Sequence, residues 1–117
     1  MIKKTIKGNL NNEVLNETAT ILKKLLKNNL IKIVLYGSYS RGDFNNFSDI
    51  DIFILVKNKK EDLNNVLDLI LNKLYELDLK YNVTINPLIE NTKVYNEYKD
   101  YSLLFENIEK EGVVLYG

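Results

Sequence analysis

The sequence predicts an α/β fold with about four strands in one sheet and helices packed on it. Apolar residues recur at helical spacing in three segments, and four shorter apolar segments have the length and pattern of strands. The segment 50–56 is almost continuously apolar, which is typical of a strand covered on both faces. The 117 residues suit one domain, 1–117.

Each element follows from a local pattern. Asn28 and Asn29 end the first helical pattern, Pro87 is typical of an edge strand or a strand end, and Gly112 fits the C-cap of the last helix. In chain order, we expect a helix over about 13–27, strands over 31–36 and 50–56, a helix over 61–77, a strand over 81–89, a helical stretch over 93–110 interrupted near Asp100, and a strand over 113–116.

Composition excludes several classes of protein. The formal net charge is zero and the pI is about 6.3, so no basic field attracts nucleic acid, and we expect no direct nucleic-acid partner. The longest apolar run, 52–56, is far shorter than the ~20 residues that span a bilayer. The basic start of the chain is not followed by an apolar signal core, so we expect a soluble, cytoplasmic protein with no membrane partner.

Residue types narrow the possible chemistry. The chain has no cysteine and no histidine, which excludes disulfides, thiol chemistry, an imidazole base and a histidine-ligated zinc. A metal would have to be held by oxygen ligands, which favours Mg²⁺ or Mn²⁺. Of the sixteen basic residues, only Arg41 is an arginine. A guanidinium grips phosphate oxygens with two donors at once, whereas an ammonium acts as a point charge.

The stretch from Gly37 to Asp51 carries the candidate site. Gly37 and Ser38 directly follow a strand, where free N–H groups and a hydroxyl can hold phosphate oxygens, although Ser38 could equally be a simple N-cap. Asp49 and Asp51 are two apart in an expected strand, so both should leave the same face. Two neighbouring carboxylates suit one or two divalent ions, or they merely solubilise a strand end.

The combination of Gly37-Ser38, ten residues, and then Asp49-x-Asp51 resembles the active-site signature of the DNA polymerase beta-like nucleotidyltransferase superfamily. Arg41-Gly42-Asp43, Ser48 and the ending from Asn107 to Tyr116 are similar to its small bacterial branch, the minimal nucleotidyltransferase (MNT) domain proteins. The resemblance covers nearly the whole chain. It implies the nucleotidyltransferase fold, with a small mixed sheet.

The resemblance also implies roles for individual residues. Gly37 and Ser38 would hold the β- and γ-phosphates of ATP, and Arg41 would help to neutralise them. Asp49 and Asp51 would bind Mg²⁺ or Mn²⁺, and with Ser38 they would form the catalytic set. A hydroxyl would attack the α-phosphate and expel pyrophosphate. Tyr39 could stack on a base or sugar, or simply pack in the fold.

One departure from the family pattern keeps alternatives open. The family usually carries a third carboxylate on a later strand, but the expected strand there offers Asn82, Thr84 and Asn86 on one face, and none is acidic. Asp78 and Glu90 are the nearest acids and are not in obvious register. Asparagine and threonine cannot accept a proton at neutral pH, so this departure favours nucleotide and metal binding and leaves turnover open.

The partner is likewise implied by the resemblance. Small members of the branch resemble antitoxins that transfer AMP to a tyrosine of a HEPN-domain ribonuclease toxin. This leads to the hypothesis of an adenylyltransferase antitoxin that forms a complex with its toxin. Two alternatives are an antitoxin that neutralises the toxin by complex formation alone, and a nucleotidyltransferase that modifies an antibiotic-like small molecule.

Overall fold

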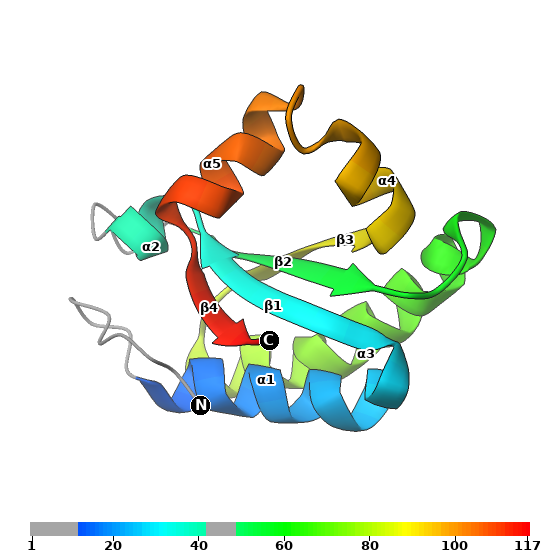
Figure 1. Ribbon diagram of the computed structural model, residues 1–117. Helices are drawn as coiled ribbons and strands as arrows, with labels where there is room; N and C mark the ends of the chain where they lie inside the picture. The colour runs from blue at the N-terminus through cyan, green and yellow to red at the C-terminus, as the bar shows by residue number, and fades with distance from the viewer. Residues whose placement is uncertain (1–11, 42–48) are drawn as a thin grey trace.

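The computed structural model describes residues 12–41 and 49–117 (Figure 1). The described helices are α1 (Asn12–Leu26), α2 (Ser38–Arg41), α3 (Leu63–Tyr81), α4 (Thr92–Tyr98) and α5 (Leu103–Glu111), with short 3₁₀ turns at Lys27–Asn29 and Lys60–Asp62. The strands are β1 (Leu30–Tyr36), β2 (Ile50–Val56), β3 (Ile85–Asn91) and β4 (Val113–Tyr116). None of the helices within these described ranges has the length and apolar character needed to cross a membrane.

The four strands form one mixed sheet in the order β3-β2-β1-β4. β1 runs antiparallel to both β2 and β4, whereas β2 and β3 are parallel. The expected α/β fold, with a small mixed sheet of four strands and helices packed on it, is therefore confirmed. It is consistent with the nucleotidyltransferase fold.

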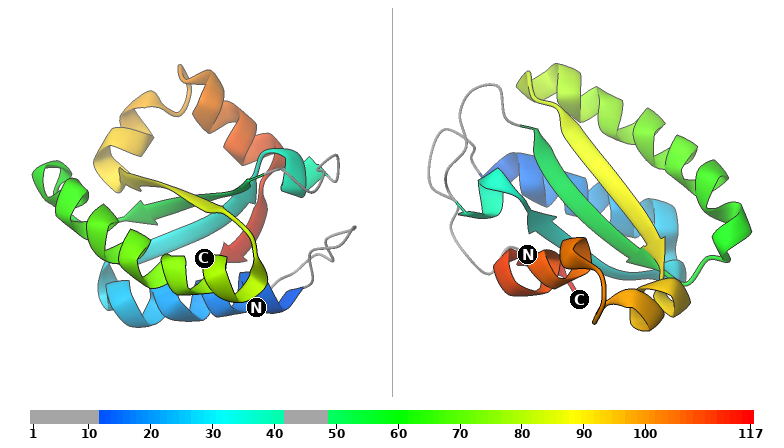
Figure 2. Two further views of the ribbon diagram at one scale, coloured as in Figure 1. Left: turned by 180° about the vertical axis from the view of Figure 1, so that it is seen from behind. Right: turned by 90° about the horizontal axis from the view of Figure 1, so that it is seen from above.

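Helices cover both faces of the sheet (Figures 1 and 2). α1 and α3 lie on one face over the larger core, to which β2 contributes Ile50, Ile52, Ile54 and Val56. α4 and α5 lie on the other face over a smaller core that contains Val34, Phe53, Leu55, Tyr95, Phe105 and Ile108. β2 is thus buried on both sides, as its continuous apolar run predicts.

Most expected elements agree with the structure, but the strand expected over 81–89 begins too early. Tyr81 is the last residue of α3, and Asn82 caps that helix in the left-handed conformation, with φ of 53°. Asparagine tolerates this conformation well, so the helix ends there and the strand starts only at Ile85. Of the three polar residues expected on one strand face, only Asn86 lies in β3.

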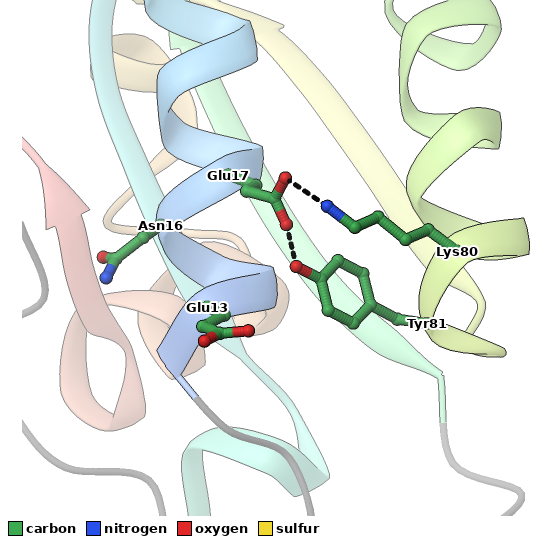
Figure 3. A pocket seen from close by; sticks show the side chains of 5 residues that line it. All are labelled: Glu13, Asn16, Glu17, Lys80 and Tyr81. Carbon is green, nitrogen blue, oxygen red and sulfur yellow. Dashed lines mark hydrogen bonds and ion pairs between the residues drawn. The ribbon is translucent and has the colours of Figure 1, made fainter.

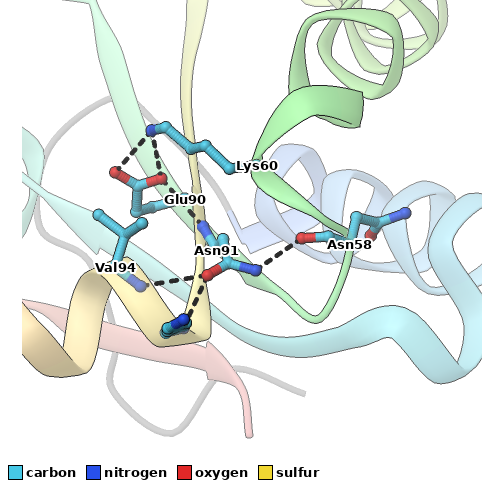
Figure 4. A network of polar contacts seen from close by, with 6 residues as sticks. Asn58, Lys60, Glu90, Asn91 and Val94 are labelled. Atoms are coloured by element: carbon cyan, nitrogen blue, oxygen red, sulfur yellow. Dashed lines mark hydrogen bonds and ion pairs between the residues drawn. The ribbon is translucent and has the colours of Figure 1, made fainter.

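A polar network fixes the far end of β3 (Figure 4). The side chain of Asn91 accepts hydrogen bonds from the N–H groups of Lys93 and Val94 and caps α4, and it donates to the Asn58 carbonyl at 2.7 Å. Glu90 pairs with Lys60 at 3.0 Å. Asp51 pairs with Asn86 near the beginning of β3, whereas Glu90 is bonded near the end of this strand. Glu90 therefore lies away from Asp51.

Gly112 caps α5 as expected, but its backbone is extended, with φ of −67° and ψ of 148°. Glycine is needed there because a Cβ atom would lie 2.3 Å from Val34 Cγ1 and 2.4 Å from the Ile108 carbonyl oxygen. The close approach lets the chain turn directly from α5 into β4.

Phe105 should be a main anchor of the smaller core, since its ring centroid lies 5.8 Å from that of Phe53 and 5.0 Å from that of Tyr95. We expect Phe105→Ala to lower the free energy of unfolding by about 3 kcal/mol, as is typical of a truncated buried aromatic residue. Urea denaturation followed by circular dichroism measures this. Leu103→Ala, in the same helix but 71% exposed, should change the stability by less than about 0.5 kcal/mol. Equal effects would contradict the packing assignment.

Candidate active site

The candidate site lies at one end of the sheet. Strand register places Tyr36, the last residue of β1, opposite Asp51 near the start of β2. Asp51 is in turn the register partner of Asn86 near the start of β3. β4 begins at the same end, with Val113 paired to Leu35. Figure 1 shows α2 directly after the end of β1, so four strand ends and α2 surround this region.

Gly37 and Asp51 are in close contact. Gly37 follows β1 with φ of 76°, a conformation that L side chains rarely adopt. A Cβ atom at this position would lie only 2.6 Å from Oδ2 of Asp51. Glycine is therefore required both for the backbone turn and for the space that the Asp51 carboxylate occupies.

The turn after Gly37 is closed by hydrogen bonds to its carbonyl oxygen. The N–H groups of Ser40 and Arg41 donate to this oxygen at 3.1 and 3.2 Å, and the Ser40 hydroxyl donates at 2.8 Å. These bonds hold the start of α2 against the end of β1. The predicted phosphate-holding side chain of Ser38 and the side chain of Tyr39 lie outside the described residues, as do Gly42, Asp43 and Ser48.

Asn86 approaches the second oxygen of Asp51. Its side-chain Nδ2 donates a hydrogen bond to Oδ1 of Asp51 at 3.1 Å. An amide group therefore stands on β3 beside the carboxylate of β2. The Asp51 side chain is thereby held by Asn86 at one oxygen and lies against Gly37 at the other.

Asp49 lies immediately before β2 rather than inside it, so strand alternation does not determine the direction of its side chain. It is exposed, whereas Asp51 is half-buried. Its charge acts on Asp78, in the last turn of α3. Burial raises the pKa of the Asp78 carboxyl, and the nearby Asp49 carboxylate raises this pKa further, partly offset by the hydrogen bond from the Ile85 N–H. Asp78 is thus an acid near the motif that sequence register did not reveal.

Arg41 reaches from α2 to the end of α5. Its Nη1 donates to Oε2 of Glu111 at 3.2 Å, and both side chains are partly exposed. An exposed ion pair of this kind contributes ~0–1 kcal/mol, so phosphate oxygens can compete for the guanidinium. Glu111 is a residue of this region to which the sequence pattern assigned no role in the site.

Tyr36 borders the site on the face of the smaller core. Burial raises the pKa of its phenol, and the adjacent Asp51 carboxylate raises it further. The raised pKa means that the Tyr36 phenol stays neutral at neutral pH.

An open cavity of about 350 Å³ lies between α1 and the end of α3 (Figure 3). Glu13, Asn16, Glu17, Lys80 and Tyr81 line it. Glu17 is already bonded there, since it accepts from Lys80 Nζ at 3.0 Å and from the Tyr81 hydroxyl. These satisfied groups stabilise the packing of α1 on α3, so we do not count this cavity as part of the candidate site.

The donor set of the site fits a hard cation. Asp49 and Asp51 provide carboxylate oxygens, and the missing Cβ of Gly37 leaves the room that positions one of them. Within 12–41 and 49–117, no three acidic side chains lie close enough together to hold an ion. Mg²⁺ is commonly held by one or two carboxylates together with substrate phosphates, so two aspartates are enough ligands for a cation that a nucleotide would also coordinate.

A mixed four-stranded sheet, with a glycine turn against the aspartate motif at the start of β2, is the arrangement expected of a nucleotidyltransferase. The chain belongs to the nucleotidyltransferase domain family, whose profile matches residues 15–115. The sequence-based prediction of a nucleotidyltransferase is therefore confirmed.

Related proteins agree with this assignment. Residue identity is 37% with "Putative protein adenylyltransferase MJ0604" of Methanocaldococcus jannaschii, over 89% of this chain and 96% of that protein. It is 31% with "Putative protein adenylyltransferase MJ0141" of the same organism, over 75% of this chain and 87% of that protein.

Two solved structures share the fold. One is a crystal structure of a toxin–antitoxin with AMP-PNP, with a TM-score of 0.60 and 22% identity. The other is a mutant of the toxin–antitoxin MntA–HpeT, with a TM-score of 0.59 and 20% identity. Each match covers 87% of this chain and 73% of the other.

Gly37→Ala should disturb the site in two separable ways. We expect a loss of about 2 kcal/mol or more in unfolding free energy, because of the positive φ and the contact with Asp51. In an Asp51→Ala background the contact disappears, so the same substitution should cost only about 1 kcal/mol. Chemical denaturation of the four proteins measures the difference. Equal costs in both backgrounds would show that Asp51 does not occupy the space beside Gly37.

Proposed function

We propose that this protein transfers AMP from ATP to a hydroxyl group and releases pyrophosphate. The observation that carries the proposal is the position of Asp51, held between Gly37 and Asn86, with Asp49 two residues earlier at the same strand end. Two carboxylates next to a glycine turn form a site for a divalent cation and for the triphosphate that completes its coordination.

In this proposal each residue has a defined task. Asp49 and Asp51 would hold Mg²⁺ or Mn²⁺, which supplies charge stabilisation for the phosphates in the transition state. Gly37 and Ser38 would hold the β- and γ-phosphates. Arg41 would exchange its bond to Glu111 for phosphate oxygens, which its exposed ion pair permits. These groups act mainly by positioning and electrostatics, as is general for phosphoryl-type transfer.

In the transfer step, the acceptor oxygen forms a bond to the α-phosphorus of ATP. The bond from this phosphorus to the bridging oxygen breaks, and pyrophosphate leaves with the electron pair. The acceptor hydroxyl loses its proton to solvent, because the Asn86 amide beside Asp51 cannot accept it. A positioned base typically contributes ~10²–10⁴-fold, so transfer without one is slower but still possible.

The acceptor in this proposal is a tyrosine of a HEPN-type ribonuclease toxin, and the protein acts as the antitoxin of the pair. Two lines of similarity support it. The two relatives named above carry the name "Putative protein adenylyltransferase", and the two solved structures named above are described as toxin–antitoxin. This chain has no histidine and so cannot itself supply the arginine–histidine motif of such a ribonuclease.

The neutral side chain of Asn86 supports a second candidate function. A neutral amide in place of an acid suits a protein that binds nucleotide and cation but turns over poorly. In that case the antitoxin would neutralise its toxin by forming a stable complex. The two candidates differ in whether the toxin is covalently changed.

Intact-mass spectrometry separates them. We expect the protein encoded by the neighbouring gene to gain one or more AMP units when it is mixed with this protein, ATP and Mg²⁺. Asp51→Asn should reduce the rate of this gain by at least about a hundredfold, because the variant loses a metal-binding charge. Asp68→Asn, which removes an exposed carboxylate from the middle of α3, serves as the matched control and should leave the rate unchanged.

A partner that is silenced in a stable complex without any mass gain would establish the second candidate instead. A gain that survives in Asp51→Asn would contradict the proposed site.

Asn86→Asp tests whether the missing acid limits the rate. The new carboxylate would stand beside Asp51 and could accept the acceptor proton, so we expect AMP transfer to accelerate by at least about tenfold. Initial rates at neutral pH with saturating Mg²⁺ measure it. Asn65→Asp adds the same charge on an exposed turn of α3 and should have no effect. An unchanged or slower rate in Asn86→Asp would show that deprotonation of the acceptor is not limiting.

A further inference from the structure

Arg41 is anchored close to the aspartate motif. It is the last residue of α2, and its N–H donates to the Gly37 carbonyl at 3.2 Å. Gly37 is the residue whose missing side chain makes room for the Asp51 carboxylate. Arg41 therefore lies within one helical turn of the residue that touches Asp51.

Glu111 reaches the same end of the sheet from α5, of which it is the last residue. The next residue, Gly112, packs so closely that a Cβ atom there would clash with Val34. β4 then pairs with β1, with Val113 opposite Leu35. The main chain of Glu111 is therefore held beside the end of β1, and the end of α5 lies next to α2 (Figures 1 and 2).

The two side chains form an ion pair between α2 and α5. Nη1 of Arg41 lies 3.2 Å from Oε2 of Glu111, and the side chains are 45% and 41% exposed. A guanidinium binds carboxylate oxygens with the same planar set of donors that binds phosphate oxygens. The Glu111 carboxylate therefore occupies a donor that a phosphate group would use.

The stability of α5 does not explain an acid at its last position. The carbonyl groups at the end of a helix carry partial negative charge, so a basic residue is favourable there and a carboxylate is not. Lys110 follows this rule and pairs with Glu106 of the same helix at 2.6 Å. Glu111 does not follow it and pairs with Arg41 of another helix. We therefore relate the acid at this position to its contact with α2.

We propose that Glu111 is a positioning residue that holds the Arg41 guanidinium until a phosphate chain replaces it, and that binds it again after pyrophosphate has left. The inference rests on the proposed function, which assigns Arg41 to the β- and γ-phosphates. Glu111 competes with these phosphates, so it lowers the affinity of the site for ATP and for pyrophosphate. It leaves the affinity for AMP unchanged, because AMP lacks both of these phosphates.

Isothermal titration calorimetry of the full chain with Mg²⁺–ATP, Mg²⁺–pyrophosphate and AMP tests the proposal. Glu111→Gln keeps the size of the side chain and removes its charge. We expect it to bind Mg²⁺–ATP and Mg²⁺–pyrophosphate about two- to fivefold more tightly than the wild type, the range for one exposed ion pair, and to bind AMP equally well. Glu106→Gln removes an exposed charge from the same helix and should change none of the three affinities.

Arg41→Gln separates competition for the guanidinium from a general effect of charge. This variant should bind Mg²⁺–ATP more weakly than the wild type. In its background Glu111→Gln should no longer tighten Mg²⁺–ATP binding, because no guanidinium remains to be released. Tightening of the same size in both backgrounds, or tightening of AMP as much as of ATP, would mean that the Glu111 charge repels the ligand directly and would overturn the proposal.

A failure of the proposed function would give a different result. If the wild type does not bind Mg²⁺–ATP, or if Asp51→Asn or Arg41→Gln binds it as well as the wild type does, the assumed site is wrong and the inference falls with it. If both variants lose affinity but Glu111→Gln binds all three ligands as the wild type does, Glu111 does not compete for Arg41. The inference is then overturned while the proposed function stands.

Discussion

Asp51 occupies a space that exists only because Gly37, the residue directly after the neighbouring strand β1, has no side chain. A Cβ at Gly37 would lie 2.6 Å from its carboxylate oxygen, and the positive φ of Gly37 excludes most other residues independently. The register of β1 on β2 sets this contact, and the core sets the register. Ile50 and Ile52, on either side of Asp51, are fully buried on the opposite face of the sheet. A slip by one residue would turn Asp51 into the larger core and take both isoleucines out of it, so packing energy holds the carboxylate in the site.

The rest of the site follows from the central position of β2. Because β1 pairs with one edge of β2 and β3 with the other, Asp51 meets a glycine turn on one side and the Asn86 amide on the other. The two cores bury all residues of β2 except Asp51. This strand can therefore carry a carboxylate only near its end, where solvent and substrate have access. The same sheet that stabilises the fold therefore determines where charge can be placed.

Sequence periodicity predicted β2 and β4 with their observed bounds, because their apolar residues alone define the strands. It failed between α3 and β3. Leu77 and Tyr81 continue the helical spacing, and Asn82 is a residue type that favours a left-handed helix end, yet alternation in the following residues suggested a longer strand. The sequence named Asn86 as a polar residue of the later strand but could not say that it pairs with Asp51. The contact between Asn86 and Asp51 depends on a parallel pairing across 35 residues, and local pattern contains no information on that register.

The distribution of negative charge around the motif separates two acids that look equivalent in the sequence. Glu90 has Lys60 at 3.0 Å and adds little net charge to its surroundings. Asp78 is bonded to a main-chain N–H, makes no salt bridge within the described part of the chain, and is acted on by the charge of Asp49. The sequence could not separate these two acids, because their difference lies in a main-chain contact and an ion pair that form only in the folded chain. The same holds for Asn86, which holds Asp51 through its side-chain amide without adding a further negative charge on β3.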